Sequence, residues 1–280
     1  MEERVQPQPD SRHADRRGRP RAFALVAAAA LLAALATLPA PPAAAFTPET
    51  QVNVAMEAAR LAPPDLARQI ERREKEYRAG VLDPFRDADP ARHAAGQGGQ
   101  LEAVIVEEAN RAVEAIRNHR PFDEVVRQLG VVAHYVADAN NPLNTAAADP
   151  RENDYFVDYA RYVAATEPRL PLVFYGLTPA LEKRSDVSPL VAVTVARGRR
   201  LYPLVGREYR RIGFARGVGN FDDRSTAFGV ASLSFSHAVT DVVRVLRWIW
   251  IRAGGIDDRS TLPERGGRLL RIQRQPAAER

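Results

Sequence analysis

The helical spacing of apolar residues is the feature that most constrains how this chain can fold. Between Thr50 and Ala253, apolar side chains recur three and four residues apart in almost every segment, which is the period of one helix face. No segment shows the strict alternation of apolar and polar residues that is typical of a half-buried strand. The sequence therefore predicts an all-α protein, a single-domain multi-helix bundle over residues 46–255.

Prolines and glycines divide this pattern into separate helices. The expected helices cover residues 50–62, 65–79, 100–118, 122–140, 154–165, 189–211 and 225–253. Pro63 and Pro121 stop or separate helices, Pro189 lies just inside a helix start, and Gly80 takes the place that a helix C-terminus prefers. Residues 256–280 are charged and contain proline, so we expect a polar, flexible C-terminal tail.

The first 45 residues have the organisation of a secretory signal peptide. Five arginines lie within residues 12–21, an apolar run broken only by Thr37 covers 22–38, and alanines at 43–45 supply the small residues of a cleavage site. The alternative is a membrane anchor, but prolines interrupt the run where a spanning helix would continue. We expect a secreted or periplasmic protein, cleaved after Ala45 so that Phe46 becomes the N-terminus, with no membrane span after cleavage.

Charge and cysteine content narrow the classes of function. The chain has 40 Lys and Arg against 35 Asp and Glu, and it has no cysteine. This balance does not by itself indicate a nucleic-acid-binding protein. Without disulfides, an exported protein of this kind must be stabilised by its core or by metal ions.

One pair of residues has the spacing of a metal site. His134 and Asp138 are four residues apart within an expected helix, so both side chains can reach a single cation on one helix face. For such a pair taken alone, a structural hydrogen bond is the more frequent outcome. The Gly- and Pro-rich loop over residues 81–99 adds His93 and several aspartates, and loops of this kind carry function more often than helices do.

Two further pairs share the same spacing. Asp154 and Asp158 would repel each other unless a cation or a proton lies between them, although both can be solvated and Asp154 can cap a helix. His237 and Asp241 lie in the strongly apolar last helix. There we expect a buried hydrogen-bonded pair rather than a set of metal ligands.

These residues give the chain a resemblance to the zinc-dependent phospholipase C and S1/P1 nuclease superfamily, which are secreted all-helical phosphodiesterases with three clustered zinc ions. The resemblance covers most of residues 46–255. It rests on a signal peptide followed by an aromatic residue, on H-x-x-x-D at 134–138, and on the apolar closing helix. The family continues with P-L-H where this chain has P-L-N at 142–144.

The resemblance implies a set of metal ligands at positions of this chain that match the family's. They are Phe46 through its amine and carbonyl, a loop aspartate at Asp83 (or Asp87 or Asp89), and His93, His134, Asp138, Asn144, Asp154 and Asp158. The site made of the loop aspartate, His93, His134 and Asp138 keeps every ligand. Family histidines are replaced at Gln51, Asn144 and Asp154.

These replacements bear on which metals the chain can hold. Two imidazoles and two carboxylates form a set that Zn²⁺ accepts, so one zinc site is expected, with up to three implied by the family. The set at Asn144, Asp154 and Asp158 offers oxygen ligands, which favour Mg²⁺, Ca²⁺ or Mn²⁺.

Two functions remain open at this point. The first is a secreted metal-dependent phosphodiesterase, phospholipase C-like or nuclease-like, in which water activated by the metal and held by Asp138 hydrolyses a phospholipid or single-stranded nucleic acid. The second is a catalytically degenerate helical binding or structural protein on the same scaffold, with one bound metal or none. No obligate protein partner is inferred.

Overall fold

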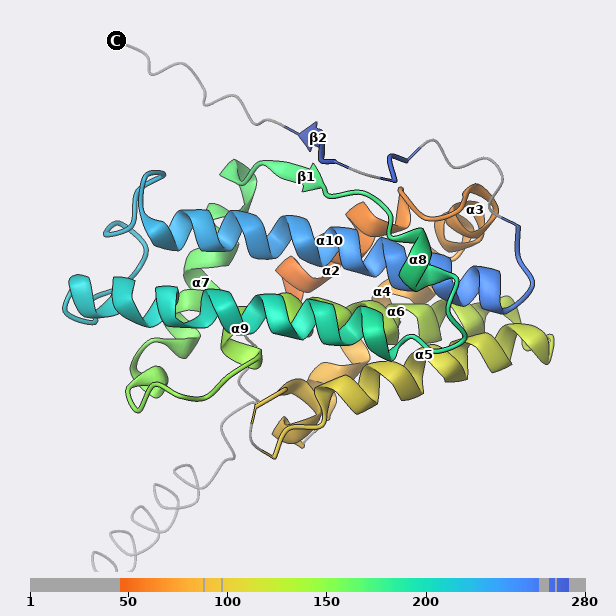
Figure 1. The fold of residues 1–280 in the computed structure, drawn as a ribbon, viewed down its shortest axis with the longest axis horizontal. Coiled ribbons are helices and arrows are strands. Elements are labelled where there is room, and N and C mark those ends of the chain that lie inside the picture. The colour runs from red at the N-terminus through yellow and green to blue at the C-terminus, as the bar shows by residue number, and fades with distance from the viewer. Residues whose placement is uncertain (1–45, 88, 97, 257–261, 265, 272–280) are drawn as a thin grey trace, which may run out of the picture. The chain divides into compact units, whose positions relative to one another are not determined.

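The computed structural model describes residues 46–271 apart from positions 88, 97, 257–261 and 265 (Figure 1). The signal peptide expected over residues 1–45 lies outside the described residues. The described chain is all-α, as the apolar spacing predicts, with nine α-helices, several 3-10 turns and one small sheet. Within the described residues, no helix combines the length and the apolar character needed to cross a bilayer.

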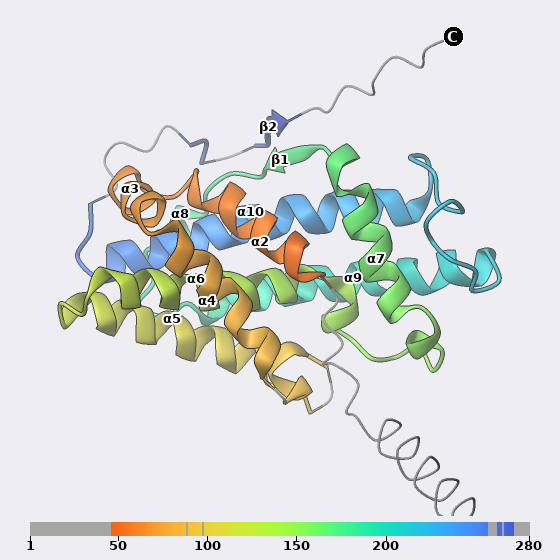
Figure 2. The same cartoon turned by 180° about the vertical axis from the view of Figure 1, so that it is seen from behind.

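The helices are α2 Pro48–Ala59, α3 Pro64–Arg72, α4 Glu74–Leu82, α5 Leu101–Arg117, α6 Phe122–Asn140, α7 Phe156–Thr166, α8 Pro179–Glu182, α9 Ser188–Arg211 and α10 Thr226–Arg252. The long helices α9 and α10 run side by side, with α5 and α6 alongside them, while α2, α4 and α7 are best seen from behind (Figures 1 and 2).

Helix α6 is the centre of the bundle. It contacts α2, α4, α5, α9 and α10, and every residue from Val132 to Asn140 is buried. A polar side chain in such a helix cannot be hydrated, so it must find its hydrogen-bond partners inside the protein. This requirement applies directly to His134 and Asp138.

Two glycines let α4 and α6 cross at very short range. A Cβ atom at Gly80 would lie 1.9 Å from the carbonyl oxygen of Arg127, and one at Gly130 would lie 2.3 Å from that of Tyr77. Any side chain at either position would push the two helices apart. The prediction that Gly80 ends a helix is therefore wrong, because it lies inside α4 as a contact surface for α6.

The predicted helix over residues 65–79 is also two helices rather than one. Arg73 leaves helical geometry at φ −128° between α3 and α4. Its guanidinium donates a hydrogen bond to Asp123 at 2.7 Å, near the start of α6. The apolar spacing continues through this break, which is why the sequence pattern does not reveal it.

A short antiparallel sheet, β1 Leu172–Phe174 with β2 Arg268–Arg271, corrects the expectation that the chain has no strands. The strands are too short to show a period of two. Helix α10 also holds this segment, since Ser236 and Thr240 accept hydrogen bonds from the amides of Val173 and Tyr175, each at 3.1 Å. Strand β2 falls within the segment expected to be a flexible tail.

Candidate metal centre

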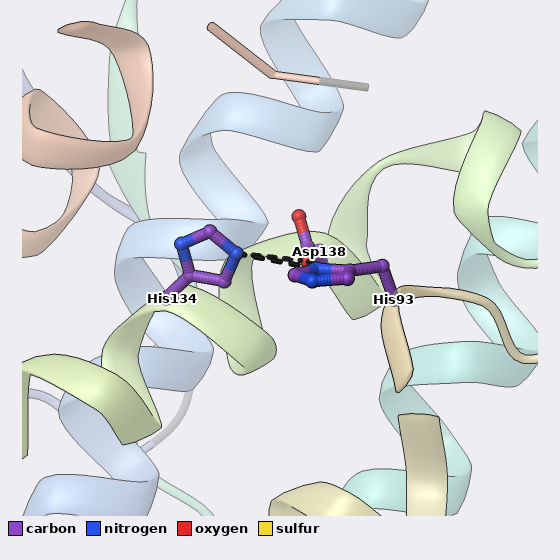
Figure 3. A group of neighbouring side chains, drawn as sticks. All are labelled: His93, His134 and Asp138. Atoms are coloured by element: carbon purple, nitrogen blue, oxygen red, sulfur yellow. Dashed lines mark hydrogen bonds and ion pairs between the residues drawn. The ribbon is translucent and has the colours of Figure 1, made fainter. Parts of the chain in front are cut away.

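Three buried side chains converge at the C-terminal half of α6 (Figure 3). His134 and Asp138 come from α6 itself, and His93 comes from the 3-10 turn Pro90–His93 in the loop before α5. His93 Nδ1 lies 2.7 Å from Asp138 Oδ2 and 3.4 Å from His134 Nε2, and His134 Nε2 lies 3.2 Å from Asp138 Oδ2. This group of three can hold a metal ion.

The close crossing of α4 and α6 orients one imidazole. His134 Nδ1 donates a hydrogen bond to the carbonyl oxygen of Val81 at 2.8 Å. That carbonyl lies in the last turn of α4, and Pro84, three residues on, has no N–H to offer it. The bond places a proton of His134 on Nδ1 and leaves Nε2 facing His93 and Asp138, where it can carry a second proton or bind a metal ion. A backbone acceptor in this role is typical of metal-binding histidines.

Gln51 fixes the carboxylate from the opposite side. Its Nε2 donates a hydrogen bond to Asp138 Oδ1 at 2.7 Å, while Asp138 Oδ2 faces the two imidazoles. Gln51 lies on α2 and is fully buried, and its Oε1 has no hydrogen-bond partner among the described residues. Gln51, at a position where the resemblance implies a histidine, therefore orients Asp138.

The charges of the cluster are strongly coupled. Burial raises the pKa of Asp138, but the charges and hydrogen bonds of His134 and His93 outweigh it, so the pKa of Asp138 is lowered overall. Burial lowers the pKa of His93, but the hydrogen bond and charge of Asp138 raise it above its ordinary value. Asp138 is therefore an anion that draws a positive charge, either a proton or a metal ion, into this position.

The distances suit a tetrahedral zinc site. Zinc bonds of ~2.0–2.1 Å to nitrogen and oxygen place neighbouring ligand atoms ~3.3 Å apart. The separations of 3.2 and 3.4 Å from His134 Nε2 match this value, and the 2.7 Å hydrogen bond between His93 and Asp138 would open slightly. A zinc ion held by these three residues would keep a fourth position for water or another ligand.

A cavity of about 280 Å³ adjoins the cluster, and His93 belongs to both. Its lining residues are Phe85, Pro90, His93, Ala94, Gly96, Leu143, Asn144, Ala146, Ala147, Glu152, Asn153, Phe156 and Val157. His93 and Asn144 are buried, whereas Pro90, Ala147 and Val157 are exposed, so the cavity leads from the surface to His93, although neither His134 nor Asp138 belongs to its lining.

The loop aspartates implied by the resemblance have other partners. Asp83 accepts two hydrogen bonds from Arg127, at 2.6 and 2.9 Å, and Asp87 pairs with Arg92 at 2.7 Å. Asp89 caps the turn that carries His93, by accepting from the amide of Ala91 at 2.9 Å. None of the three joins the ligand atoms, so the expected four-ligand set is reduced to three.

The expected pair of Asp154 and Asp158 does not share a helix face. Asp154 lies in the 3-10 turn Glu152–Asp154, is exposed and pairs with Arg151 at 2.6 Å. Asp158 lies in α7 and accepts from the hydroxyl of Tyr209 at 2.7 Å and the amide of Gly217 at 2.6 Å. Both carboxylates are therefore used in structural contacts away from the cluster.

The remaining implied ligands occupy different surroundings. Asn144 is 4% exposed, lines the cavity, and its Nδ2 has no hydrogen-bond partner in the described part of the chain. Phe46 is fully buried in the core beside the start of α2. Cleavage after Ala45, which its amine would need to bind a metal, lies outside the described residues.

The sequence does not identify two groups at or beside this centre, the Glu152 carboxylate and the Val81 carbonyl. Glu152 lines the cavity, but in the sequence it is one acidic residue in a polar segment. The Val81 carbonyl belongs to the backbone, so no residue type in the sequence identifies it, and only the glycines at the helix crossing indicate that the two helices lie close together.

No protein-family model matches the chain, and comparison with curated proteins gives no match.

Proposed function

We propose that this chain is a metal-dependent phosphoric ester hydrolase that binds one Zn²⁺ through His93, His134 and Asp138. The observation that carries the proposal is the bond from His134 Nδ1 to the Val81 carbonyl. With its proton on Nδ1, a neutral His134 presents a second acceptor, Nε2, 3.2 Å from an oxygen of the Asp138 carboxylate, which only accepts hydrogen bonds. Two acceptors at this distance repel unless a proton or a metal ion lies between them.

Bound zinc would supply a water of lowered pKa near neutral pH and a positive charge for the phosphoryl oxygens. Asp138 would hold the ion through Oδ2 while Gln51 keeps that carboxylate in place through Oδ1. His134 would be kept in the binding tautomer by Val81. His93 would bind through Nδ1 and so carry its own proton on Nε2, a buried atom without a hydrogen-bond partner among the described residues.

The proposal includes kinship with the zinc-dependent phospholipase C and S1/P1 nuclease superfamily, as a divergent member. The convergence of His93, His134 and Asp138 supports it, since the resemblance assigns those three residues to one site. A single ion is proposed because Asp154 and Asp158 are engaged elsewhere. We also propose export with cleavage after Ala45, to a secreted or periplasmic location.

The alternative is a helical binding or structural protein without catalysis. One observation favours it: the hydrogen bonds from His93 and Gln51 to Asp138 already satisfy the carboxylate without a metal. In that case the cluster would be a buried ion pair that holds the loop over residues 83–93 to α6.

Metal analysis separates the two. The protein is purified, dialysed against micromolar zinc and measured for zinc content, alongside His134→Ala, His93→Ala and Asp138→Asn. The control is His237→Ala, which removes another largely buried histidine outside the cluster. We expect one zinc per chain in the wild type and the control, and none in the other three. A zinc-free wild type, or equal loss of zinc in His237→Ala, contradicts the proposal.

A further inference from the structure

The cavity beside His93 has an apolar body and a single charged group. Phe85, Leu143, Phe156 and Val157 form most of its wall, with alanine and proline between them. Among the described residues, Glu152 is the only charged one in the lining apart from His93, and no arginine or lysine belongs to it. An apolar wall favours an uncharged group, and a carboxylate without a cation nearby repels an anion.

Glu152 is held in place rather than neutralised. Its Oε2 accepts a hydrogen bond from the hydroxyl of Tyr202, and that same hydroxyl accepts from the amide of Asp149 at 3.0 Å. In the described part of the chain, no arginine or lysine forms an ion pair with Glu152, in contrast to Asp83, Asp149 and Asp154. Glu152 therefore contributes to the cavity lining a carboxylate that no described cation pairs with.

The buried end of the cavity offers polar atoms without partners. Asn144 Nδ2 and His93 Nε2 are both buried and have no hydrogen-bond partner among the described residues. These two residues are 4% and 7% exposed. Buried polar groups are nearly always paired, so two such atoms beside one cavity point to a ligand that brings acceptor oxygens.

We propose that this cavity binds a compact, uncharged apolar group of the substrate, with a phosphoryl oxygen accepting a hydrogen bond from Asn144 at the buried end, and that Glu152 excludes substrates carrying a second negative charge. This inference rests on the proposed function and names its substrate class: a phosphate ester of a small apolar alcohol, not a polyanion. The volume of about 280 Å³ is at the lower end of ligand pockets and suits a group of roughly one or two rings.

The test is calorimetric titration of the full zinc-loaded chain with three phosphonates. Methylphosphonate probes the phosphoryl end alone, phenylphosphonate adds an apolar ring, and 4-carboxyphenylphosphonate adds a second negative group. We expect phenylphosphonate to bind at least about tenfold more tightly than methylphosphonate. We expect the carboxylated ligand to lose most of that gain.

Two matched variants locate the effect. Val157 and Val193 are 51% and 46% exposed, on α7 and α9, and only Val157 lines the cavity. Val157→Trp should remove the preference for the phenyl ligand, whereas Val193→Trp should keep it. Glu152→Gln should raise the affinity for 4-carboxyphenylphosphonate about tenfold more than the affinity for phenylphosphonate, because the added carboxylate brings the larger repulsion.

The possible results separate a failure of the proposed substrate class from a failure of the proposed zinc site. A protein that takes up no zinc contradicts the proposed function and the inference together. A zinc-loaded protein that binds methyl- and phenylphosphonate equally, or whose preference survives Val157→Trp, contradicts the inference alone. An unchanged affinity for the carboxylated ligand in Glu152→Gln contradicts the role of Glu152.

Discussion

Two helices of this protein carry a histidine and a buried aspartate four residues apart, and they use them differently. On α6, His134 and Asp138 meet a second imidazole, and among the described residues no arginine pairs with Asp138. On α10, Asp241 accepts hydrogen bonds from Arg197 at 2.7 Å and Arg244 at 2.9 Å. The spacing alone therefore does not make a metal site, because the groups brought in by neighbouring elements decide what the aspartate binds.

The histidine of the α10 pair packs against an aromatic ring instead of facing a second histidine. His237 stacks on Tyr175, with ring centroids 4.0 Å apart. The expected hydrogen bond between His237 and Asp241 is not formed, since Nδ1 of His237 has no partner among the described residues and Asp241 is taken by the two arginines and Thr194. The α10 pair is therefore structural, whereas the α6 pair is available to a cation.

The largest expected effect comes from breaking the α10 cluster. Asp241→Ala leaves Arg197 and Arg244 without their buried carboxylate, which should lower the free energy of unfolding by about 3–5 kcal/mol. Asp138→Asn should cost only ~1–2 kcal/mol, because the amide keeps the size and part of the hydrogen bonding of the carboxylate. Urea unfolding of metal-free protein measures both. Equal losses would mean that the two aspartates play the same structural role.

Zinc should stabilise the protein through α6 alone. At a free zinc concentration 100 times the dissociation constant, binding to the folded state adds about 2.7 kcal/mol to the free energy of unfolding. We expect this gain in the wild type and in His237→Ala, and its loss in His134→Ala. Unfolding curves with zinc and with a chelator provide the measurement. A gain that persists in His134→Ala would place the metal elsewhere.

Helices α6 and α10 each contain a glycine, and only the glycine on α6 is closely packed against another helix. Gly130→Ala on α6 should destabilise the protein by about 1–3 kcal/mol, because its Cβ would meet the Tyr77 carbonyl at 2.3 Å. It should also weaken zinc binding ~10–100-fold by moving Val81 away from His134. Gly229→Ala on α10 is the control, since a Cβ there meets nothing within 4 Å. This substitution should stabilise the protein by ~0.4–1 kcal/mol.

The smallest expected effect is a pH dependence carried by α10. Burial, with the nearby charges of Arg197 and Arg244, lowers the pKa of His237 to about 4, from the ordinary value of 6.5, against the opposing charge of Asp241. Between these values the unfolded chain binds more protons than the folded one, so stability falls as pH falls from 6.5 towards 4. Because His237 is partly exposed, the loss should be only about 1 kcal/mol.

His237→Phe should keep the stacking on Tyr175 and remove this part of the pH dependence. Urea unfolding at pH 7 and pH 5 compares the variant with the wild type. If both lose the same stability between these pH values, His237 is not the titrating group.

The sequence predicts the all-α class and most helix positions, because amphipathic spacing reports directly which faces are buried. It does not reveal the break at Arg73, because the apolar spacing continues across it. It also misses the sheet, whose strand β1 is partly held by the hydroxyls of Ser236 and Thr240.

For the metal centre, the sequence identifies His134 and Asp138 by their spacing of four residues within a helix, and His93 by its place in a polar loop. None of the three loop carboxylates joins them, and for Asp83 the reason is an arginine 44 residues away that the sequence does not connect to it. Arg127 takes Asp83 and Arg92 takes Asp87. The contribution of Val81 is a backbone carbonyl placed by a helix crossing, and residue identity carries no information about it.

The proposed divalent metal ion would bind between α6 and the loop before α5. The most direct measurement is a crystal structure of the zinc-loaded protein with anomalous data collected at the zinc edge. We predict a single peak about 2.0–2.2 Å from His93 Nδ1, His134 Nε2 and Asp138 Oδ2. The absence of a peak there, with the hydrogen bonds of His93 and Gln51 to Asp138 intact, would contradict the account.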